Sequence, residues 1–154
     1  MDPEDYAERG GLWEALERKK LPFYNFGEAN ETAHNREDWN DTATGGAHAV
    51  MVPMQKALWK NTSHNYAGFN CNIPDQFRME QFESEFTKLW LKPNKEMPRL
   101  ITMQVPNDHT ADPRPKDGYP YHESYVADND LAIGRILHFL SRTPYWKNML
   151  VVGF

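Results

Sequence analysis

Two adjacent side chains that could bind a divalent metal ion follow a short apolar stretch of the sequence. Asp108 and His109 lie in the segment Pro106-Asn-Asp-His-Thr110, directly after the mostly apolar residues 99–105. A carboxylate oxygen and an imidazole nitrogen are common ligands of Zn²⁺ and related ions. If residues 99–105 form a buried strand, both side chains lie beyond its carboxyl end, where open α/β sheets bind ligands. The alternative is a turn stabilised by Asn and Asp, with the histidine on the surface.

Three polar neighbours could extend this pair into a phosphate site. Arg114 has a planar guanidinium that can bind two oxygens of one phosphate group. Asn107 and Thr110 add weaker hydrogen-bonding groups close to the candidate metal ligands. With Asp108 and His109 these groups could contact a phosphate, and the alternative is the same surface turn, in which Asp and Asn make turn hydrogen bonds.

A second acidic cluster comes at the start of the next predicted helix and consists of Glu123, Asp128 and Asp130. A favourable interaction with the helix dipole explains the first two, whereas Asp130 lies deeper in the helix and could face a site. The five other histidines lack metal-ligand spacing, and Cys71 has no evident base beside it. The sequence contains no glycine-rich phosphate loop and no Gly-x-Ser-x-Gly motif.

Hydrophobic spacing and helix-breaking residues indicate which elements position these side chains. Apolar residues at helical spacing, ended by prolines, predict helices, and short apolar runs predict strands. Asp75 is the expected N-cap of the helix that Pro93 ends. The predicted order is helix 10–19, strand 23–26, helix 75–92, strand 99–105, helix 122–142 and strand 149–152. Such alternation predicts an α/β fold with a mostly parallel sheet covered by helices.

The long segment 28–74 shows little periodicity and is rich in Asn, Asp, Thr, Gly and His. A segment of this kind usually covers or builds a functional site. We interpret residues 1–154 as one domain, with 28–74 as an irregular covering loop and 99–154 as a core strand-loop-helix-strand segment. Because a buried parallel strand needs neighbours on both faces, the position of strand 149–152 leads us to expect a fragment of a larger domain.

Composition narrows the classes of protein. The chain has 154 residues, 40% of them hydrophobic, and its 5 Trp, 7 Tyr and 8 Phe suffice for one core. A net charge of −5 without a basic block argues against a nucleic-acid groove. The single cysteine excludes an internal disulfide and a cysteine zinc cluster. The sequence contains no apolar run of about eighteen residues, so it predicts no transmembrane helix. The first residues lack the pattern of a secretory signal.

Several segments together resemble the bacterial phosphoesterases of the alkaline phosphatase superfamily, in particular the type found fused to β-propellers. The specific part of the resemblance is the block 105–147, which contains Pro106-Asn-Asp-His-Thr110, Arg114-Pro115, Val126-Ala-Asp-Asn-Asp-Leu-Ala-Ile-Gly-Arg-Ile136 and Pro144-Tyr-Trp-Lys147. An Asp followed by Ile-Gly-Arg-Ile-Leu is also similar to a stretch in sulfatases. Looser matches come at Gly11-Leu-Trp13, Phe23-Tyr-Asn-Phe-Gly-Glu28 and Ile73-Pro-Asp75, so the likeness spans most of the chain.

The resemblance implies a partial alkaline-phosphatase-like, doubly wound α/β fold and two divalent metal ions, usually zinc. In that family a Ser or Thr nucleophile attacks phosphorus, and water then hydrolyses the phospho-enzyme. By position, Asp108 and His109 would be metal ligands, Arg114 a phosphate contact and Asp130 a structural residue. The expected partner is a small-molecule phosphate ester, with no nucleic acid and no membrane span. Intact relatives are commonly extracytoplasmic, although this chain carries no targeting segment.

The chain departs from the family's pattern at both ends. Nothing before Gly10 resembles the first metal-binding strand or the nucleophile segment, and no acidic metal-binding segment follows strand 149–152. We therefore expect an incomplete catalytic domain whose nucleophile lies outside this chain and which is inactive alone. Two alternatives stay open. One is a truncated chain without autonomous function, and the other is a non-catalytic module that binds carbohydrate or protein through Trp39, Trp59, Tyr66 and Phe69.

Overall fold

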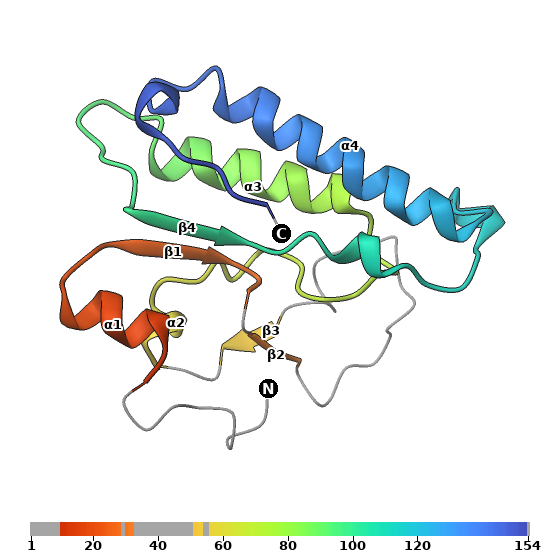
Figure 1. The fold of residues 1–154 in the computed structure, drawn as a ribbon, viewed down its shortest axis with the longest axis horizontal. Coiled ribbons are helices and arrows are strands. Elements are labelled where there is room, and N and C mark those ends of the chain that lie inside the picture. Colours follow the sequence, from red (N-terminus) through yellow and green to blue (C-terminus); the bar gives the residue numbers. More distant parts are fainter. Residues whose placement is uncertain (1–9, 29, 33–50, 54–55, 154) are drawn as a thin grey trace.

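The computed structural model describes residues 10–28, 30–32, 51–53 and 56–153 of the chain (Figure 1). Its main elements are α1 (Leu12–Arg18), β1 (Phe23–Phe26), β2 (Asn30–Thr32), β3 (Met51–Pro53), α2 (Lys56–Trp59), α3 (Asp75–Leu89), β4 (Leu100–Met103) and α4 (His122–Leu140). The short 3-10 helices are η2 (Pro106–His109), η3 (Pro115–Asp117) and η4 (Trp146–Asn148). The predicted positions of α1, β1, α3, β4 and α4 are confirmed to within a few residues at their ends. None of the described helices is both long and apolar enough to cross a membrane.

β1 and β4 pair in parallel and form a two-stranded sheet, as the alternation of elements predicted. Their register places Phe23 opposite Leu100 and Tyr24 opposite Ile101. Successive side chains of a strand point to opposite faces of a sheet. Phe23 and Leu100 therefore pack on one face, and Tyr24 and Ile101 pack on the other.

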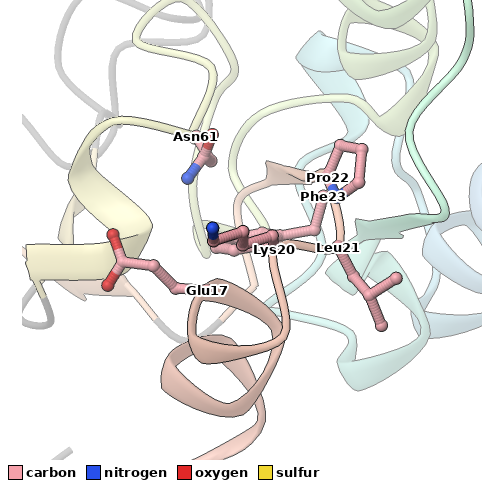
Figure 2. Close-up of a pocket in the computed structure, with 6 residues that line it drawn as sticks. All are labelled: Glu17, Lys20, Leu21, Pro22, Phe23 and Asn61. Atoms are coloured by element: carbon pink, nitrogen blue, oxygen red, sulfur yellow. The ribbon is translucent and has the colours of Figure 1, made fainter.

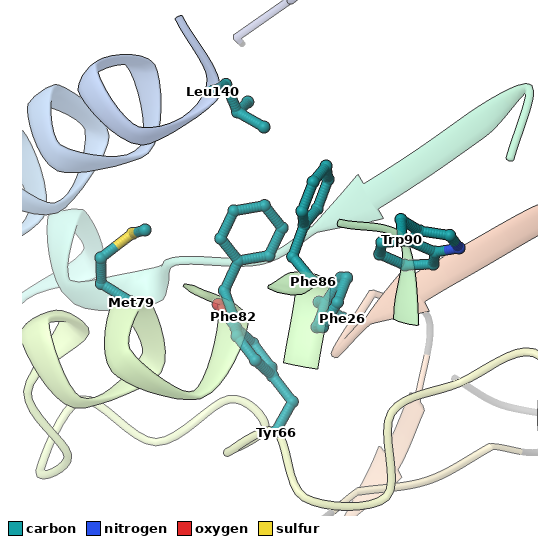
Figure 3. Close-up of a cluster of buried hydrophobic side chains, with 7 residues drawn as sticks. All are labelled: Phe26, Tyr66, Met79, Phe82, Phe86, Trp90 and Leu140. Carbon is teal, nitrogen blue, oxygen red and sulfur yellow. The ribbon is translucent and has the colours of Figure 1, made fainter. Parts of the chain in front are cut away.

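α3 and α4 pack against each other and cover the Tyr24 face of the sheet (Figure 1). The buried positions of α3, at 75, 78, 79, 82 and 86, recur at helical spacing, so one side of the helix faces the core. Aromatic rings dominate this core: Phe26 meets Phe82 edge to face at a centroid distance of 5.0 Å. Figure 3 shows its buried side chains, Phe26, Tyr66, Met79, Phe82, Phe86, Trp90 and Leu140.

The opposite face of the sheet is covered by α1 and α2. Trp13 of α1 packs against Phe23 at a centroid distance of 5.5 Å, and Leu58 of α2 is completely buried in the same cluster. Helices thus lie on both faces of a parallel pair of strands. The fold is a mixed α/β fold, as the sequence predicted.

The predicted covering loop 28–74 contains more regular structure than its composition indicated. β2 and β3 pair antiparallel, with Glu31 opposite Val52, and α2 follows shortly after β3. Hydrogen bonding to Asn25 of β1 also fixes the segment after α2, because Asn25 N–H donates to the Asn61 carbonyl at 2.8 Å. Residues 33–50 of the predicted loop lie outside the described residues.

The predicted buried strand at 149–152 is wrong. Within the described residues the parallel sheet contains only β1 and β4, and residues 149–153 are not in a strand. Leu150 is 86% exposed and Val152 is 67% exposed. An apolar run forms a buried strand only when a neighbouring strand offers hydrogen bonds, and no described strand pairs with this run.

Candidate functional site

The turn that carries Asp108 and His109 follows β4 directly. Val105 is extended, and Pro106 begins η2, a position that suits a residue with a fixed φ and no N–H. Asp108 and His109 are exposed, and the His109 ring makes an edge contact with Phe69 at a centroid distance of 5.2 Å. The two candidate ligands therefore lie beyond the carboxyl end of a parallel strand, as the sequence predicted.

Thr110 ends this turn in a backbone conformation that β-branched residues rarely adopt. Its φ is 58° and its ψ is 171°, a combination that costs about 1–3 kcal/mol in a residue other than glycine. Its N–H donates to the Asn107 carbonyl at 3.0 Å. Such strain persists only where surrounding contacts hold the chain in place. Thr110, a weak candidate for substrate contact, is half-buried.

Asn107, the other weak candidate for substrate contact, is completely buried. Its backbone N–H donates to Asp75 Oδ2 at 3.0 Å, and its side-chain Nδ2 donates to Asp128 Oδ2 at 2.7 Å. Its Oδ1 has no hydrogen-bond partner among the described residues. In this position Asn107 fixes the turn from inside and does not face solvent.

Asp75 and Arg78 form a completely buried ion pair in the first turn of α3. Arg78 Nη1 donates to Asp75 Oδ1 at 2.9 Å. The remaining N–H groups of the guanidinium donate to backbone carbonyls of the preceding loop, those of Ala67, Gly68, Asn70 and Ile73. A buried charge is tolerated when it is both paired and hydrogen-bonded, and Arg78 meets both conditions.

The second oxygen of Asp75 holds two further groups. Asp75 Oδ2 accepts from the Asn107 N–H and from Asn129 Nδ2, each at 3.0 Å. Burial raises the pKa of the Asp75 carboxyl, while Arg78 and these two donors lower it in part. The predicted N-cap role of Asp75 is wrong: Pro74 precedes the helix and Asp75 is its first residue, so the side chain contacts the η2 turn instead.

The acidic cluster of α4 consists of one half-buried side chain, Asp128, and two exposed ones. Glu123 and Asp130 are exposed, so no other described element covers them. Asp128 does not act on its own helix: its Oδ2 accepts from the backbone N–H of Asp75 at 2.7 Å. The dipole interpretation of Asp128 is therefore corrected, because the helix end that it contacts is that of α3.

Arg114, the candidate phosphate contact, is largely engaged by neighbouring groups. Its Nε donates to the Tyr125 hydroxyl at 2.9 Å, and its Nη2 donates to the Asn72 carbonyl at 3.2 Å. Its guanidinium lies 5.3 Å from the centroid of the Tyr119 ring. Arg114 also forms an ion pair with Asp117, in which Nη1 lies 3.3 Å from Asp117 Oδ2. This ion pair is open to solvent, because the Asp117 side chain is 44% exposed.

The donor chemistry of the turn fits part of a divalent-metal site. Asp108 supplies a carboxylate and His109 an imidazole, both ordinary ligands of zinc. Among the described residues, however, no group of three or more His, Cys, Asp or Glu side chains is arranged to hold a metal ion. Catalytic zinc sites use three protein ligands, so a complete centre requires ligands from elsewhere.

Sequence reasoning missed Asn129, which donates to the Val105 carbonyl just before the turn, and Arg78, which pairs with Asp75. A signal for Arg78 was present: Asp75 and Arg78 are oppositely charged, three residues apart, and occupy the same helix face as Met79 and Phe82. Charges on the buried face of a helix indicate a buried ion pair. No comparable signal in the sequence links Asn129 to the turn.

The sequence analysis also considered Cys71, Tyr66 and Trp59, which lie in different surroundings. Cys71 is half-buried, its Sγ contacts the Pro106 carbonyl at 3.4 Å, and burial raises the pKa of its thiol. Tyr66, one of the aromatic residues considered for an alternative binding surface, lies in the core and donates to the Gln104 carbonyl. Trp59 is half-exposed, and Trp39 lies outside the described residues.

A shallow groove of about 240 Å³ lies at the opposite end of the parallel strands, beside the end of α1 and the start of β1 (Figure 2). Its lining residues are Glu17, Lys20, Leu21, Pro22, Phe23 and Asn61. None of the residues predicted to bind metal or phosphate lines it.

No family model, no curated protein and no solved structure matches this chain. Its function must therefore be inferred from its residues and their geometry.

Proposed function

We propose that this chain supplies part of the metal-binding side of a phosphoric ester hydrolase of the alkaline phosphatase superfamily. One observation carries the proposal. Asp108 and His109 are both exposed at adjacent positions of a turn beyond the carboxyl end of β4, and buried contacts to Asn107 support that turn. Ligand sites of α/β sheets lie in this position, and these residue types suit zinc.

The fold supports the same proposal. A doubly wound sheet has helices on both faces of parallel strands, and α1 and α3 pack on opposite faces of the pair β1 and β4. In the proposed protein this pair would be part of a larger, mostly parallel sheet of the alkaline phosphatase type.

The proposed roles of the residues follow from their chemistry. Asp108 Oδ and a ring nitrogen of His109 would hold one of two zinc ions. A bound ion would act as a Lewis acid on the phosphoryl oxygens of a small phosphate ester and would lower the pKa of the nucleophile. Arg114 would bind a phosphate oxygen by exchanging its exposed partner Asp117 for the substrate, with its guanidinium kept in place by Tyr125. Thr110 would remain at the rim of this site.

The proposal assigns the Ser or Thr nucleophile and the other metal ligands to polypeptide outside the described residues. Catalytic groups that act as a unit lose most of their effect when one of them is absent. We therefore expect the chain alone to bind metal and to hydrolyse p-nitrophenyl phosphate at a negligible rate.

Calorimetric titration with zinc tests the proposal directly. The chain should bind zinc, and both Asp108→Ala and His109→Ala should abolish that binding. Asp130→Ala and His122→Ala are matched controls, because they remove the same residue types from exposed positions on α4. Both controls should bind zinc like the unchanged chain.

Two results would overturn the proposal. The first is a folded chain, verified by circular dichroism, that binds no zinc. The second is zinc binding that persists in both Asp108→Ala and His109→Ala, because the metal would then lie elsewhere.

A further inference from the structure

Two carboxylates from different helices accept hydrogen bonds from one buried residue, Asn107. Asp75, at the start of α3, accepts from its backbone N–H at 3.0 Å. Asp128, in α4, accepts from its side-chain Nδ2 at 2.7 Å. Main chain and side chain of Asn107 are therefore held by separate elements, which fixes both its position and its orientation.

One of these helices, α4, also holds the residue on the other side of Pro106. Asn129, next to Asp128 in α4, donates from Nδ2 to the Val105 carbonyl at 2.6 Å. The turn is thus fixed immediately before and immediately after Pro106. Asp128 joins the two helices as well, since it accepts from the backbone N–H of Asp75 at 2.7 Å.

This set of contacts explains how the turn can hold an unfavourable backbone at Thr110. With φ at 58° and ψ at 171°, Thr110 is strained. Its N–H is bonded to the carbonyl of Asn107, the residue that the two carboxylates fix. Asp108 and His109 lie between these two points.

We propose that Asp128 and Asp75 are positioning residues, which hold the Pro106–His109 turn in the one conformation that presents Asp108 and His109 together to a metal ion. The metal in this statement rests on the proposed function. The conformational part depends only on the hydrogen bonds to Asn107. In this proposal neither carboxylate would be a metal ligand, because each accepts a hydrogen bond from Asn107.

Asp128→Ala is the informative variant, because changing Asp75 would also leave the buried Arg78 without its partner. Hydrogen exchange of the backbone amides of residues 107–110, followed by NMR, should become faster in Asp128→Ala. Exchange in the middle of α3 and of β4 should stay as it is. Zinc binding should weaken about ten- to a hundredfold, the usual effect of losing a group that orients a metal ligand.

Three controls separate positioning from general stability. Asp128→Asn keeps an oxygen that can accept from Asn107 and Asp75, and it should restore slow exchange and zinc affinity. Leu140→Val weakens the core at the far end of α4, and it should speed exchange throughout the core without a selective effect on 107–110. Asp130→Ala removes an exposed carboxylate from the same helix and should change neither readout.

The outcomes keep the two proposals apart. If zinc binds at Asp108 and His109 but Asp128→Ala changes neither affinity nor exchange in the turn, the positioning role is overturned and the proposed function stands. If the unchanged chain binds no zinc while Asp128→Ala selectively frees the turn, the positioning of the turn stands and the proposed function is lost. Should Asp128→Ala fail to fold, Asn107→Ala removes only the Nδ2 bond to Asp128 and must give the same selective increase in exchange; unchanged exchange would overturn the role.

Discussion

Asp128 in α4 accepts a hydrogen bond at 2.7 Å from the backbone N–H of Asp75, the first residue of α3. The first N–H groups of a helix have no partner within that helix, and a nearby carboxylate both accepts from them and interacts favourably with the dipole. Here the carboxylate comes from a second helix. Hydrogen bonds therefore join the start of α3, the middle of α4 and the turn after β4. These bonds hold the turn that carries the candidate ligands from its buried side.

Replacement of Arg78 by methionine should destabilise the protein strongly. The change leaves the buried Asp75 carboxylate without its ion pair and leaves backbone carbonyls of the preceding loop without donors. Loss of one partner of a buried pair costs about 3–5 kcal/mol. Urea denaturation should show a loss of this size in the free energy of unfolding.

Lys88→Met is the matched control for Arg78→Met, because Lys88 is an exposed cation of the same helix. It should change the free energy of unfolding by no more than about 0.5 kcal/mol. Equal losses in the two variants would contradict the structural role of the Arg78 contacts.

Thr110→Gly should stabilise the protein by about 1 kcal/mol, because glycine adopts a positive φ without strain. Thr110→Ala should give no comparable gain, since its Cβ keeps the steric conflict.

Gly118 offers the reverse experiment: its φ is +89° and a Cβ there would meet no atom within 4 Å. Gly118→Ala should therefore lose about 1 kcal/mol through the backbone alone. Thermal unfolding of the three variants checks these signs, and a stabilised Thr110→Ala would contradict the role of strain.

The elements of the fold could be predicted because their signals are local. The helix that begins at Asp75 repeats its buried positions at helical spacing, and the strand that contains Leu100 is a short apolar run bounded by proline. The apolar run at Leu150 gave the same local signal, but it has no neighbouring strand among the described residues. Strand pairing depends on distant parts of the chain, so this prediction failed.

The candidate site could be predicted only on its exposed side. Asp108 and His109 stand out by residue type and by their place after a strand. Their support comes from Asp75 and Asp128, which lie 32 and 21 residues from Asn107 in the sequence. Only the packing of α3 against α4 brings both carboxylates to the turn. Contacts between distant elements leave no spacing pattern in one sequence, so the inner side of the site had to come from the structure.

Substitution of the exposed apolar residues after η4 should have little effect on stability. Leu150→Ser should change the free energy of unfolding by no more than about 0.5 kcal/mol, because Leu150 is 86% exposed. Phe86→Ala, in the centre of the aromatic core, should lose about 3–5 kcal/mol. Urea denaturation of both variants compares them directly. A loss of several kcal/mol in Leu150→Ser would instead support the buried strand that the sequence predicted.

The thiol of Cys71 should react slowly with iodoacetamide at pH 8. Its half-burial disfavours the charged thiolate and raises the pKa of the group. Because the thiolate is the reacting form, a raised pKa lowers the reactive fraction at pH 8, and the rate should continue to increase as the pH rises further.

The same chain unfolded in urea provides the reference, since its thiol is solvated and titrates near the ordinary value. Alkylation rates measured by mass spectrometry between pH 7 and pH 10, within the stable range of the fold, give both profiles. The folded profile should be displaced toward higher pH. A displacement toward lower pH would contradict the raised pKa, because it would mean that the fold favours the thiolate of Cys71.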